Sequence, residues 1–258
     1  MRPSVIVERS EVLDRAGFVH GFSGAGADAA LARSSDELVR NIRMIGGVVG
    51  FDAGRLFSVR QVHGTATHVA DLAAGDPVAF LALEGDAVVA LPGAPQADAR
   101  AAVGVRVADC VPILVGCERS GAVAAIHAGW RGIEAGVIGV AVEALRRLAP
   151  GGGHLAAIGP HIGACCFEVT EGIADAIARA ASEPRVITAR YGEGKAKVDL
   201  RLAARAQLRA AGLAAEAIDD VGGCAQCARA EGVPRYHSFR RDGAASGRML
   251  AAISPRVR

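Results

Sequence analysis

Short apolar runs divide the middle of this chain into predicted β-strands. Residues 101–107, 111–115 and 121–126 consist mostly of Val, Ile, Leu and Ala. Apolar runs of about four to eight residues are typical of strands that are buried on both faces. Pro112 marks a break between the first two runs. Shorter candidates of the same kind are residues 56–59, 86–90 and 155–158.

Helices are predicted between and after these strands. Ser34 and Glu37 form a capping box, which indicates that a helix begins there. Further helices are predicted over residues 133–148, 170–182 and 200–212. Because strands alternate with helices and no repeat or linker interrupts them, we expect a single α/β or α+β domain over residues 1–258.

Composition excludes several classes of protein. The chain has 258 residues, of which 51% are hydrophobic, so it can bury a substantial core. Its 29 basic and 27 acidic residues leave a net charge of +2 with no long basic run, which argues against a nucleic-acid partner. No segment resembles a signal peptide or a membrane span. We therefore expect a cytoplasmic protein without a membrane partner, as a monomer or a small homo-oligomer.

Polar blocks beside the predicted strands carry the candidate chemistry. Cys110, His127 and His63 each follow one of these strands. A thiol and an imidazole that meet in space are either a nucleophile–base pair or two ligands of one metal. Together with His63 they make a three-ligand set with a fourth position open, which is the pattern of a catalytic zinc. Asp109 is the candidate for orienting an imidazole. Each residue alone also fits a structural role, because free thiols are usually buried and inert.

Arginine side chains near these blocks are candidates for holding an anion. Arg131 lies near the predicted start of the helix after His127, where unpaired N–H groups and the helix dipole favour a negative ligand. Arg240 and Arg241 belong to the densest basic cluster, close to the C-terminus. Guanidinium groups match the oxygens of phosphate, so this cluster suits a small phosphate or carboxylate better than a nucleic-acid duplex.

The other cysteines form no metal motif that the sequence reveals. Cys165 and Cys166 are adjacent, which is too tight for both to ligate one zinc comfortably, and Cys224 and Cys227 form a lone C-x-x-C pair. One such pair can give two metal ligands or a redox pair, but since no second pair and no His pair lies nearby in the sequence, we do not expect a structural zinc ribbon. The 6 cysteines are expected to be free thiols or ligands rather than disulfides.

Several blocks taken together resemble one family. They read QVHG at residues 61–64, DAVV at 86–89, ADCVP at 108–112, HAGWRG at 127–132, IGPHIGACCFEV at 158–169 and SFRRDG at 238–243. Their order resembles that of the bacterial laccase-domain, or multicopper polyphenol oxidase, family, which is also described as purine nucleoside phosphorylase-like. The chain departs from the family at residues 21–27, which read GFSGAGA and lack the usual arginine.

The resemblance implies a layered α/β/β/α domain with mixed β-sheets, similar to the cysteine hydrolase fold of the toxin deamidases. It implies zinc ligands at His63, Cys110 and His127, with copper as the less favoured metal. It further implies a zinc-dependent phosphorylase of adenosine, inosine, guanosine and 5′-methylthioadenosine that also deaminates adenosine. The small-molecule partners are then a purine nucleoside and phosphate, and our candidates for holding the phosphate are Arg131, Arg240 and Arg241.

Three other functions stay open. In a metal-free cysteine hydrolase or amidase that edits peptidoglycan precursors, Cys110 is the nucleophile, His127 the base and His63 a helper. A copper polyphenol oxidase needs many His ligands, commonly in His-x-His pairs, whereas this chain has 7 His and no such pair. A non-enzymatic partner protein would bind a nucleotide in the same pocket without turnover.

Overall fold

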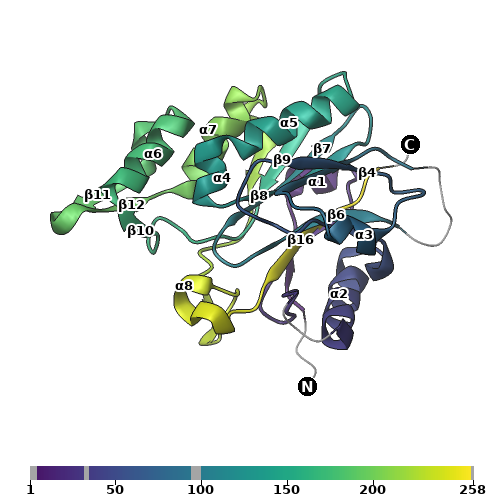
Figure 1. Ribbon diagram of the computed structural model, residues 1–258, viewed down its shortest axis with the longest axis horizontal. Coiled ribbons are helices and arrows are strands. Elements are labelled where there is room, and N and C mark those ends of the chain that lie inside the picture. Colours follow the sequence, from purple (N-terminus) through teal and green to yellow (C-terminus); the bar gives the residue numbers. More distant parts are fainter. Residues whose placement is uncertain (1–4, 32–34, 94–99, 257–258) are drawn as a thin grey trace.

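The computed structural model describes residues 5–31, 35–93 and 100–256. Two β-sheets lie face to face, and helices cover the outer face of each, so the layers run α/β/β/α (Figure 1). The first sheet has the strand order β1 (Val7–Glu8), β2 (His20–Ser23), β16 (Met249–Ile253), β6 (Ala102–Val107) and β3 (Leu56–Phe57). The second has the order β13 (Ile218–Asp220), β9 (His154–Ile158), β7 (Val111–Cys117), β8 (Val123–Ala128), β5 (Ala87–Ala90) and β4 (Thr67–Ala70).

Both sheets mix parallel and antiparallel neighbours. The pairs β3–β6, β4–β5 and β9–β13 are parallel, whereas β7 is antiparallel to both β8 and β9. A parallel pair needs a long crossover. The crossover from β9 to β13 spans residues 159–217 and contains two α-helices and the three strands of a separate small sheet.

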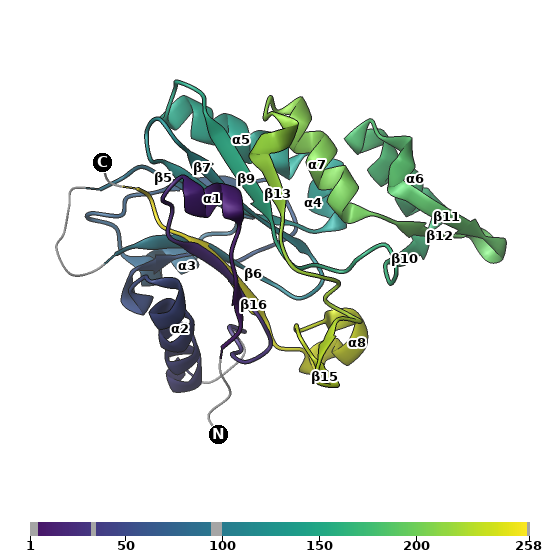
Figure 2. The ribbon, with the colours of Figure 1, turned by 180° about the vertical axis from the view of Figure 1, so that it is seen from behind.

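Helices cover both outer faces. The six-stranded sheet is covered by α4 (Trp130–Ala135), α5 (Val137–Leu148) and α7 (Leu200–Ala210), and the five-stranded sheet by α2 (Ser35–Val49) (Figure 1). One end of the molecule carries α6 (Glu171–Ala181) and a small sheet of β10 (Glu168–Thr170), β12 (Lys195–Val198) and β11 (Ile187–Tyr191) (Figure 1). The other elements are α1 (Glu11–Arg15), which packs beside β9 and β13 (Figure 2), α3 (Pro77–Leu81), α8 (Phe239–Asp242), β14 (Arg229–Ala230) and β15 (Val233–Pro234). Short 3₁₀ turns occur at Ala53–Arg55, Pro184–Val186, Gly192–Gly194, Ala215–Ala217 and Gly243–Ala245.

Successive side chains of each central strand lie on opposite faces, so each strand contributes to two separate apolar layers. Along β16, Ala251 and Ile253 face the other sheet. Leu250 and Ala252 alternate with them and face α2. Because both faces of these strands are buried, their sequences are continuous apolar runs rather than alternating ones.

The expected α/β class with mixed sheets is confirmed, with two local differences. Strand β8 extends through Ala128, so His127 lies within the strand rather than after it. The helix predicted over residues 133–148 is divided into α4 and α5, because Gly136 has a left-handed φ of 84° between them. The cap predicted at Ser34 lies outside the described residues. Within the described ranges, no helix is long and apolar enough to cross a membrane.

The register of three strands places the chemical residues together. Val111 of β7 pairs with Ala128 of β8, so Cys110, which directly precedes β7, lies beside the end of β8. On the other side of β8, the register of β5 sets Asp86 beside His127. The ends of β7, β8 and β5 therefore meet at one place.

Candidate functional site

His127 is a buried imidazole whose orientation is set by Asp86. Its side chain is 3% exposed, and its Nδ1 lies 2.7 Å from Asp86 Oδ1. The two residues are also joined through the main chain, because the His127 N–H donates to the Asp86 carbonyl at 2.7 Å. A proton on Nδ1 leaves the Nε2 lone pair free to bind a metal or to accept a proton.

The same carboxylate also holds the loop that carries His63. Asp86 accepts main-chain hydrogen bonds from His63 at 2.9 Å and from Gly64 at 2.6 Å. His63 has a left-handed φ of 62°, a conformation that is uncommon for a residue other than glycine. Asp86 therefore positions both histidines, one through its side chain and the other through its strained backbone.

The thiol of Cys110 lies between the two imidazoles. Its Sγ is 3.8 Å from His63 Nε2, and the ring centroids of His63 and His127 are 4.8 Å apart. Burial raises the pKa of Cys110, but the charge and hydrogen bonds of His127 and His63 outweigh it and lower that pKa to about 6. Burial lowers the pKa of His127, but the Cys110 charge and the Asp86 hydrogen bond outweigh it and raise that pKa to about 9. The lowered pKa therefore favours the thiolate form of Cys110.

These three side chains form a donor set that fits zinc. Their nearest ligand atoms lie within 4.8 Å of one another. A tetrahedral zinc with bonds of about 2.05 Å to nitrogen and 2.3 Å to sulfur keeps those two ligand atoms roughly 3.6 Å apart. The 3.8 Å between Cys110 and His63 is close to this value. His63 is exposed and His127 is buried, so a metal bound here would have one side open to solvent.

Gly129 leaves space that these ligands need. A Cβ at this position would lie 2.9 Å from His63 Cδ2 and 3.1 Å from Cys110 Sγ. Its φ of −70° is open to any residue, so the requirement for glycine is steric rather than conformational.

Replacing Gly129 with alanine should therefore displace the ligands without unfolding the chain. Since an error of about 1 Å in such a site costs roughly 10²-fold in activity, we expect a loss of that size together with weaker metal binding. Zinc titration against a chelator and an activity assay measure both. Gly139→Ala is the control, because nothing lies within 4 Å of its added Cβ. Equal metal affinity in the two variants would contradict the proposed packing.

A cavity of about 560 Å³ opens beside these residues. Its volume lies within the range of roughly 300–1,000 Å³ that is usual for small-molecule sites. Its wall includes His63, Cys110 and His127, the aromatic rings of Trp130, Phe167 and Phe239, and the guanidinium groups of Arg60, Arg106, Arg240 and Arg248. Aromatic faces suit a planar ring, and guanidinium groups suit an anion.

The predicted arginines divide between the cavity and the surface. Arg240 lines the cavity. Arg131 lies outside the cavity lining and is exposed, with its guanidinium 4.4 Å from the centre of the Trp130 ring. Arg241 also lies outside the lining and donates to the carbonyls of Ala225 and Gln226, both at 3.2 Å.

Asp109 lies in the cavity wall without touching either imidazole. Its Oδ2 accepts the main-chain N–H of Arg240 at 2.6 Å, which holds the start of α8 against the site. Its own φ of 83° is left-handed. The structure therefore gives the orienting contact on His127 to Asp86, and Asp109 positions Arg240.

Sequence reasoning missed three residues of this site. Asp86 precedes a buried strand, and no local signal links it to His127. Arg106 interrupts the apolar run of β6, and a lone charge within a buried strand is the signal that could have identified it. Arg248 was visible in the C-terminal basic cluster but carried no spacing that selected it.

Three of the four cavity arginines keep an unneutralised charge. Arg60 pairs with Glu84 at 2.8 Å. The side chains of Arg106, Arg240 and Arg248 instead donate to neutral oxygens, at 2.7, 3.1 and 2.8 Å, and form no ion pair within the described part of the chain. Because burial is not offset by a partner, the pKa of Arg106 falls to about 10. The cavity therefore favours an anionic ligand.

Residues 22–256 match a family model described as multi-copper polyphenol oxidoreductase laccase. The chain belongs to this family. It is 38% identical over 153 residues to adenosine deaminase RL5 of an unknown prokaryotic organism, an alignment that covers 58% of this chain and 57% of that protein. It is 32% identical over 225 residues to purine nucleoside phosphorylase YlmD of Geobacillus stearothermophilus, covering 85% of this chain and 79% of that protein.

Two solved structures have the same fold as this chain. The crystal structure of YlmD from Geobacillus stearothermophilus superimposes with a TM-score of 0.79 at 28% identity, covering 94% of this chain and 93% of that chain. A hypothetical protein YfiH from Bacillus licheniformis gives a TM-score of 0.84 at 22% identity, covering 98% and 97%. The mixed, layered α/β architecture is therefore shared with both solved structures.

Proposed function

We propose that this protein is a zinc-dependent purine nucleoside phosphorylase that also deaminates adenosine. One observation carries the proposal: the His63, Cys110 and His127 ligand atoms converge on the wall of a nucleoside-sized cavity that unneutralised guanidinium groups also line. The names of relatives such as YlmD and RL5 support this activity. A zinc held by His63, Cys110 and His127 would supply a Lewis acid that activates water or polarises the substrate.

The cavity wall suggests how each part of the substrate is held. Trp130 and Phe239 offer aromatic faces to the purine of adenosine, inosine, guanosine or 5′-methylthioadenosine. Phosphate binds to the guanidinium groups, so that its oxygen attacks C1′ of the ribose as the bond from C1′ to the purine breaks, and the purine leaves with one proton taken up from solvent. In deamination, water adds to C6 of adenosine and ammonia leaves. Asp86 keeps the His127 and His63 side chains in place for both reactions.

We assign the phosphate to Arg240, together with Arg106 and Arg248, because these three line the cavity and lack ion-pair partners. Arg131 and Arg241 were also candidates from the sequence, but their side chains lie outside the cavity lining.

Replacing Arg240 or Arg248 with alanine should raise the KM for phosphate by roughly 10- to 100-fold, since a hydrogen bond to a charged group contributes about 1.5–3 kcal/mol. Initial rates of inosine cleavage at varied phosphate concentration measure this. Arg131→Ala is the matched comparison and should leave the phosphate KM unchanged. If only Arg131→Ala raises the phosphate KM, the phosphate binds at Arg131, which was one of the candidates from the sequence.

The proposed function is tested with the purified protein, inosine and phosphate. We expect hypoxanthine and ribose 1-phosphate in equal amounts, at a rate that depends on phosphate, and inosine with ammonia when adenosine is supplied. Tight nucleoside binding without either product, in the presence of zinc and phosphate, would favour the non-enzymatic nucleotide-binding protein.

A second candidate, a cysteine hydrolase or amidase in peptidoglycan-precursor editing, is favoured by the Cys110, His127 and Asp86 arrangement. A thiol with a lowered pKa lies against an imidazole that a carboxylate orients, as a nucleophile, a base and an orienting group would. This chemistry needs no metal, so metal content separates the two functions.

The reactivity of Cys110 distinguishes the two candidates. Its pKa is lowered to about 6, so in chelator-treated protein the thiolate should persist to lower pH than in a free cysteine, whose pKa is about 8.5. Alkylation by iodoacetamide, followed on the Cys110 peptide by mass spectrometry, should therefore rise through about pH 6. Zinc should protect the thiol at neutral pH. Rapid alkylation of protein as purified, with no metal present, would favour the cysteine hydrolase.

The remaining histidines argue against a multicopper oxidase. His20, His68, His161 and His237 contact main-chain groups at separate places in the fold. Within the described ranges, only two groups of side chains could hold a metal, and one of these contains no histidine. The lesser alternative of a copper polyphenol oxidase therefore has no cluster of His ligands to support it.

A further inference from the structure

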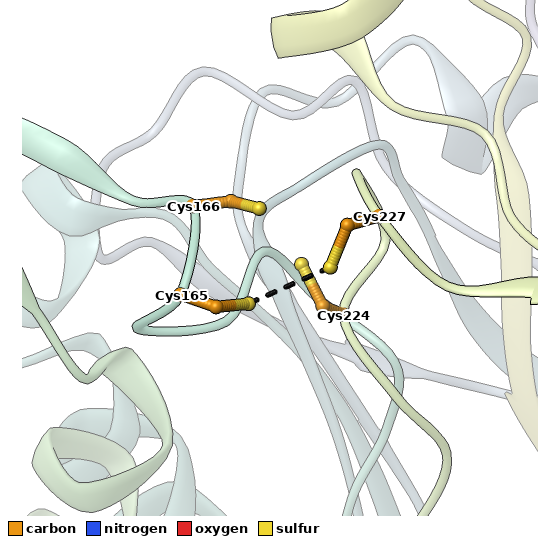
Figure 3. A group of neighbouring side chains, drawn as sticks. All are labelled: Cys165, Cys166, Cys224 and Cys227. Carbon is orange, nitrogen blue, oxygen red and sulfur yellow. Dashed lines mark hydrogen bonds between the residues drawn. The ribbon is translucent and has the colours of Figure 1, made fainter.

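The structure overturns the expectation that Cys224 and Cys227 lack companions. Their sulfur atoms and those of Cys165 and Cys166 all lie within 4.8 Å of one another. Figure 3 shows two thiols from each of two loops pointing toward a common centre. The sequence does not reveal this cluster, because the crossover between β9 and β13 separates Cys165 and Cys166 from Cys224 and Cys227. These strands are parallel neighbours, so the loops that follow them run together.

We propose that these four cysteines bind a second zinc ion, as a structural site distinct from the His63, Cys110 and His127 centre. Zinc in such a site takes four thiolates in a tetrahedron, and bonds of about 2.3 Å give sulfur–sulfur edges of roughly 3.8 Å. The Cys165 and Cys227 sulfurs are 3.6 Å apart, which agrees with such an edge. Binding converts four thiols to thiolates and releases their protons to solvent.

Groups around the cluster favour a negatively charged metal–thiolate centre. The main-chain N–H of Gly163 donates to Cys224 Sγ at 3.2 Å, and such hydrogen bonds stabilise a ligating sulfur. The ammonium of Lys197 donates to the Cys165 carbonyl at 2.6 Å, which brings a positive charge to the loop that carries Cys165 and Cys166. Four thiolates around one Zn²⁺ carry a net charge of 2−, so this cation lowers the cost of forming the site.

Residues 222–236, which carry Cys224 and Cys227, contribute few apolar side chains to the core: Ala225 and Tyr236 are buried, and Cys224 packs against the main core together with Cys166. The cluster of buried side chains there contains Val107, Ala225, Tyr236 and Met249. A loop segment with so few buried apolar side chains of its own gains stability from a structural metal. Figure 2 shows that this segment, with α8 and β15, lies apart from the main helical layers.

The proposed zinc would tie together the loops that form the cavity wall. Phe167 directly follows Cys166 and lines the cavity. The residues between Cys224 and Cys227 accept hydrogen bonds from Arg241 of α8, and the neighbouring Arg240 lines the cavity. The metal therefore supports substrate binding through position rather than through contact with the reacting atoms.

Metal content tests the proposal on protein purified without a chelator or a metal-affinity tag. We expect two zinc ions per wild-type chain, one in the double variant Cys224→Ser with Cys227→Ser, and one in Cys110→Ala. Cys117→Ser is the matched control and should retain two, because Cys117 is buried outside both clusters. One zinc ion in both wild type and Cys110→Ala, beside none in the double variant, would reject the catalytic zinc and leave the second site standing.

X-ray absorption at the zinc edge of Cys110→Ala keeps the test independent of whether the double variant folds. The expected spectrum shows four sulfur neighbours at about 2.3 Å and no nitrogen. The proposal is overturned if wild-type protein holds one zinc that Cys110→Ala loses. It is also overturned if fewer than six thiols titrate in denatured, chelator-treated protein, because disulfides would then hold the cluster instead.

Discussion

Cys110→Ala should lower the rate of inosine phosphorolysis by roughly 10³-fold or more and remove one zinc ion per chain. The thiol is the one anionic ligand of the proposed centre, and its lowered pKa shows that the site favours the thiolate. Removing it leaves two neutral imidazoles, which bind zinc far more weakly. Steady-state rates with saturating phosphate and elemental analysis of the same preparation measure both effects.

Cys117→Ser provides the control for this prediction. Cys117 is fully buried in β7, and its Sγ donates to the Gly152 carbonyl at 3.4 Å, a contact that a hydroxyl group can also make. The control should keep its zinc and its rate. If Cys110→Ala loses all turnover but the wild-type protein never contained zinc at this centre, the thiol acts as a nucleophile and the hydrolase is favoured.

Asp86→Asn should weaken zinc binding by about 10- to 100-fold, as the loss of a carboxylate behind a ligating histidine commonly does. Asp86 is fully buried and accepts from the main chain of His63 and Gly64 as well as from His127. Burial raises the pKa of Asp86, but the hydrogen bonds from His127 and Gly64 outweigh it and lower that pKa. An amide has one acceptor oxygen in place of two, so a buried N–H group loses its partner.

This lost partner should also lower the free energy of unfolding, by roughly 1–3 kcal/mol for each unsatisfied group. Chelator titration reports the metal affinity, and urea unfolding of the zinc-free protein reports the stability separately. Asp76→Asn is the control, because Asp76 caps α3 through its side chain and asparagine caps a helix about as well. Normal zinc affinity in Asp86→Asn would show that the contact with His127 is structural only.

Local patterns predicted most of the elements, because periodicity acts over a few residues. The continuous apolar runs at β6, β7 and β8 report burial on both faces, which each strand sequence displays by itself. Gly136 divides a helix that an apolar face alone would continue, since a left-handed φ depends on how the chain turns there.

The candidate site was only partly predictable. Cys110, His127 and His63 were identifiable, because each follows or ends a strand and thiol and imidazole are recognisable ligands. The choice between Asp109 and Asp86 was not, because both flank buried strands. The antiparallel register of β5 with β8 decides it, since that register puts Asp86 beside His127.

By itself, the sequence determined the class of fold, the family and the three residues of the proposed metal centre. Only the tertiary structure decided which carboxylate orients the histidines, which arginines line the cavity, and that Cys165 and Cys166 meet Cys224 and Cys227. The reason is the range of the interactions concerned. Apolar periodicity and ligand type depend on neighbouring residues. The register of β5 with β8 joins residues about 40 positions apart along the chain, and the parallel pairing of β9 with β13 joins residues about 60 positions apart.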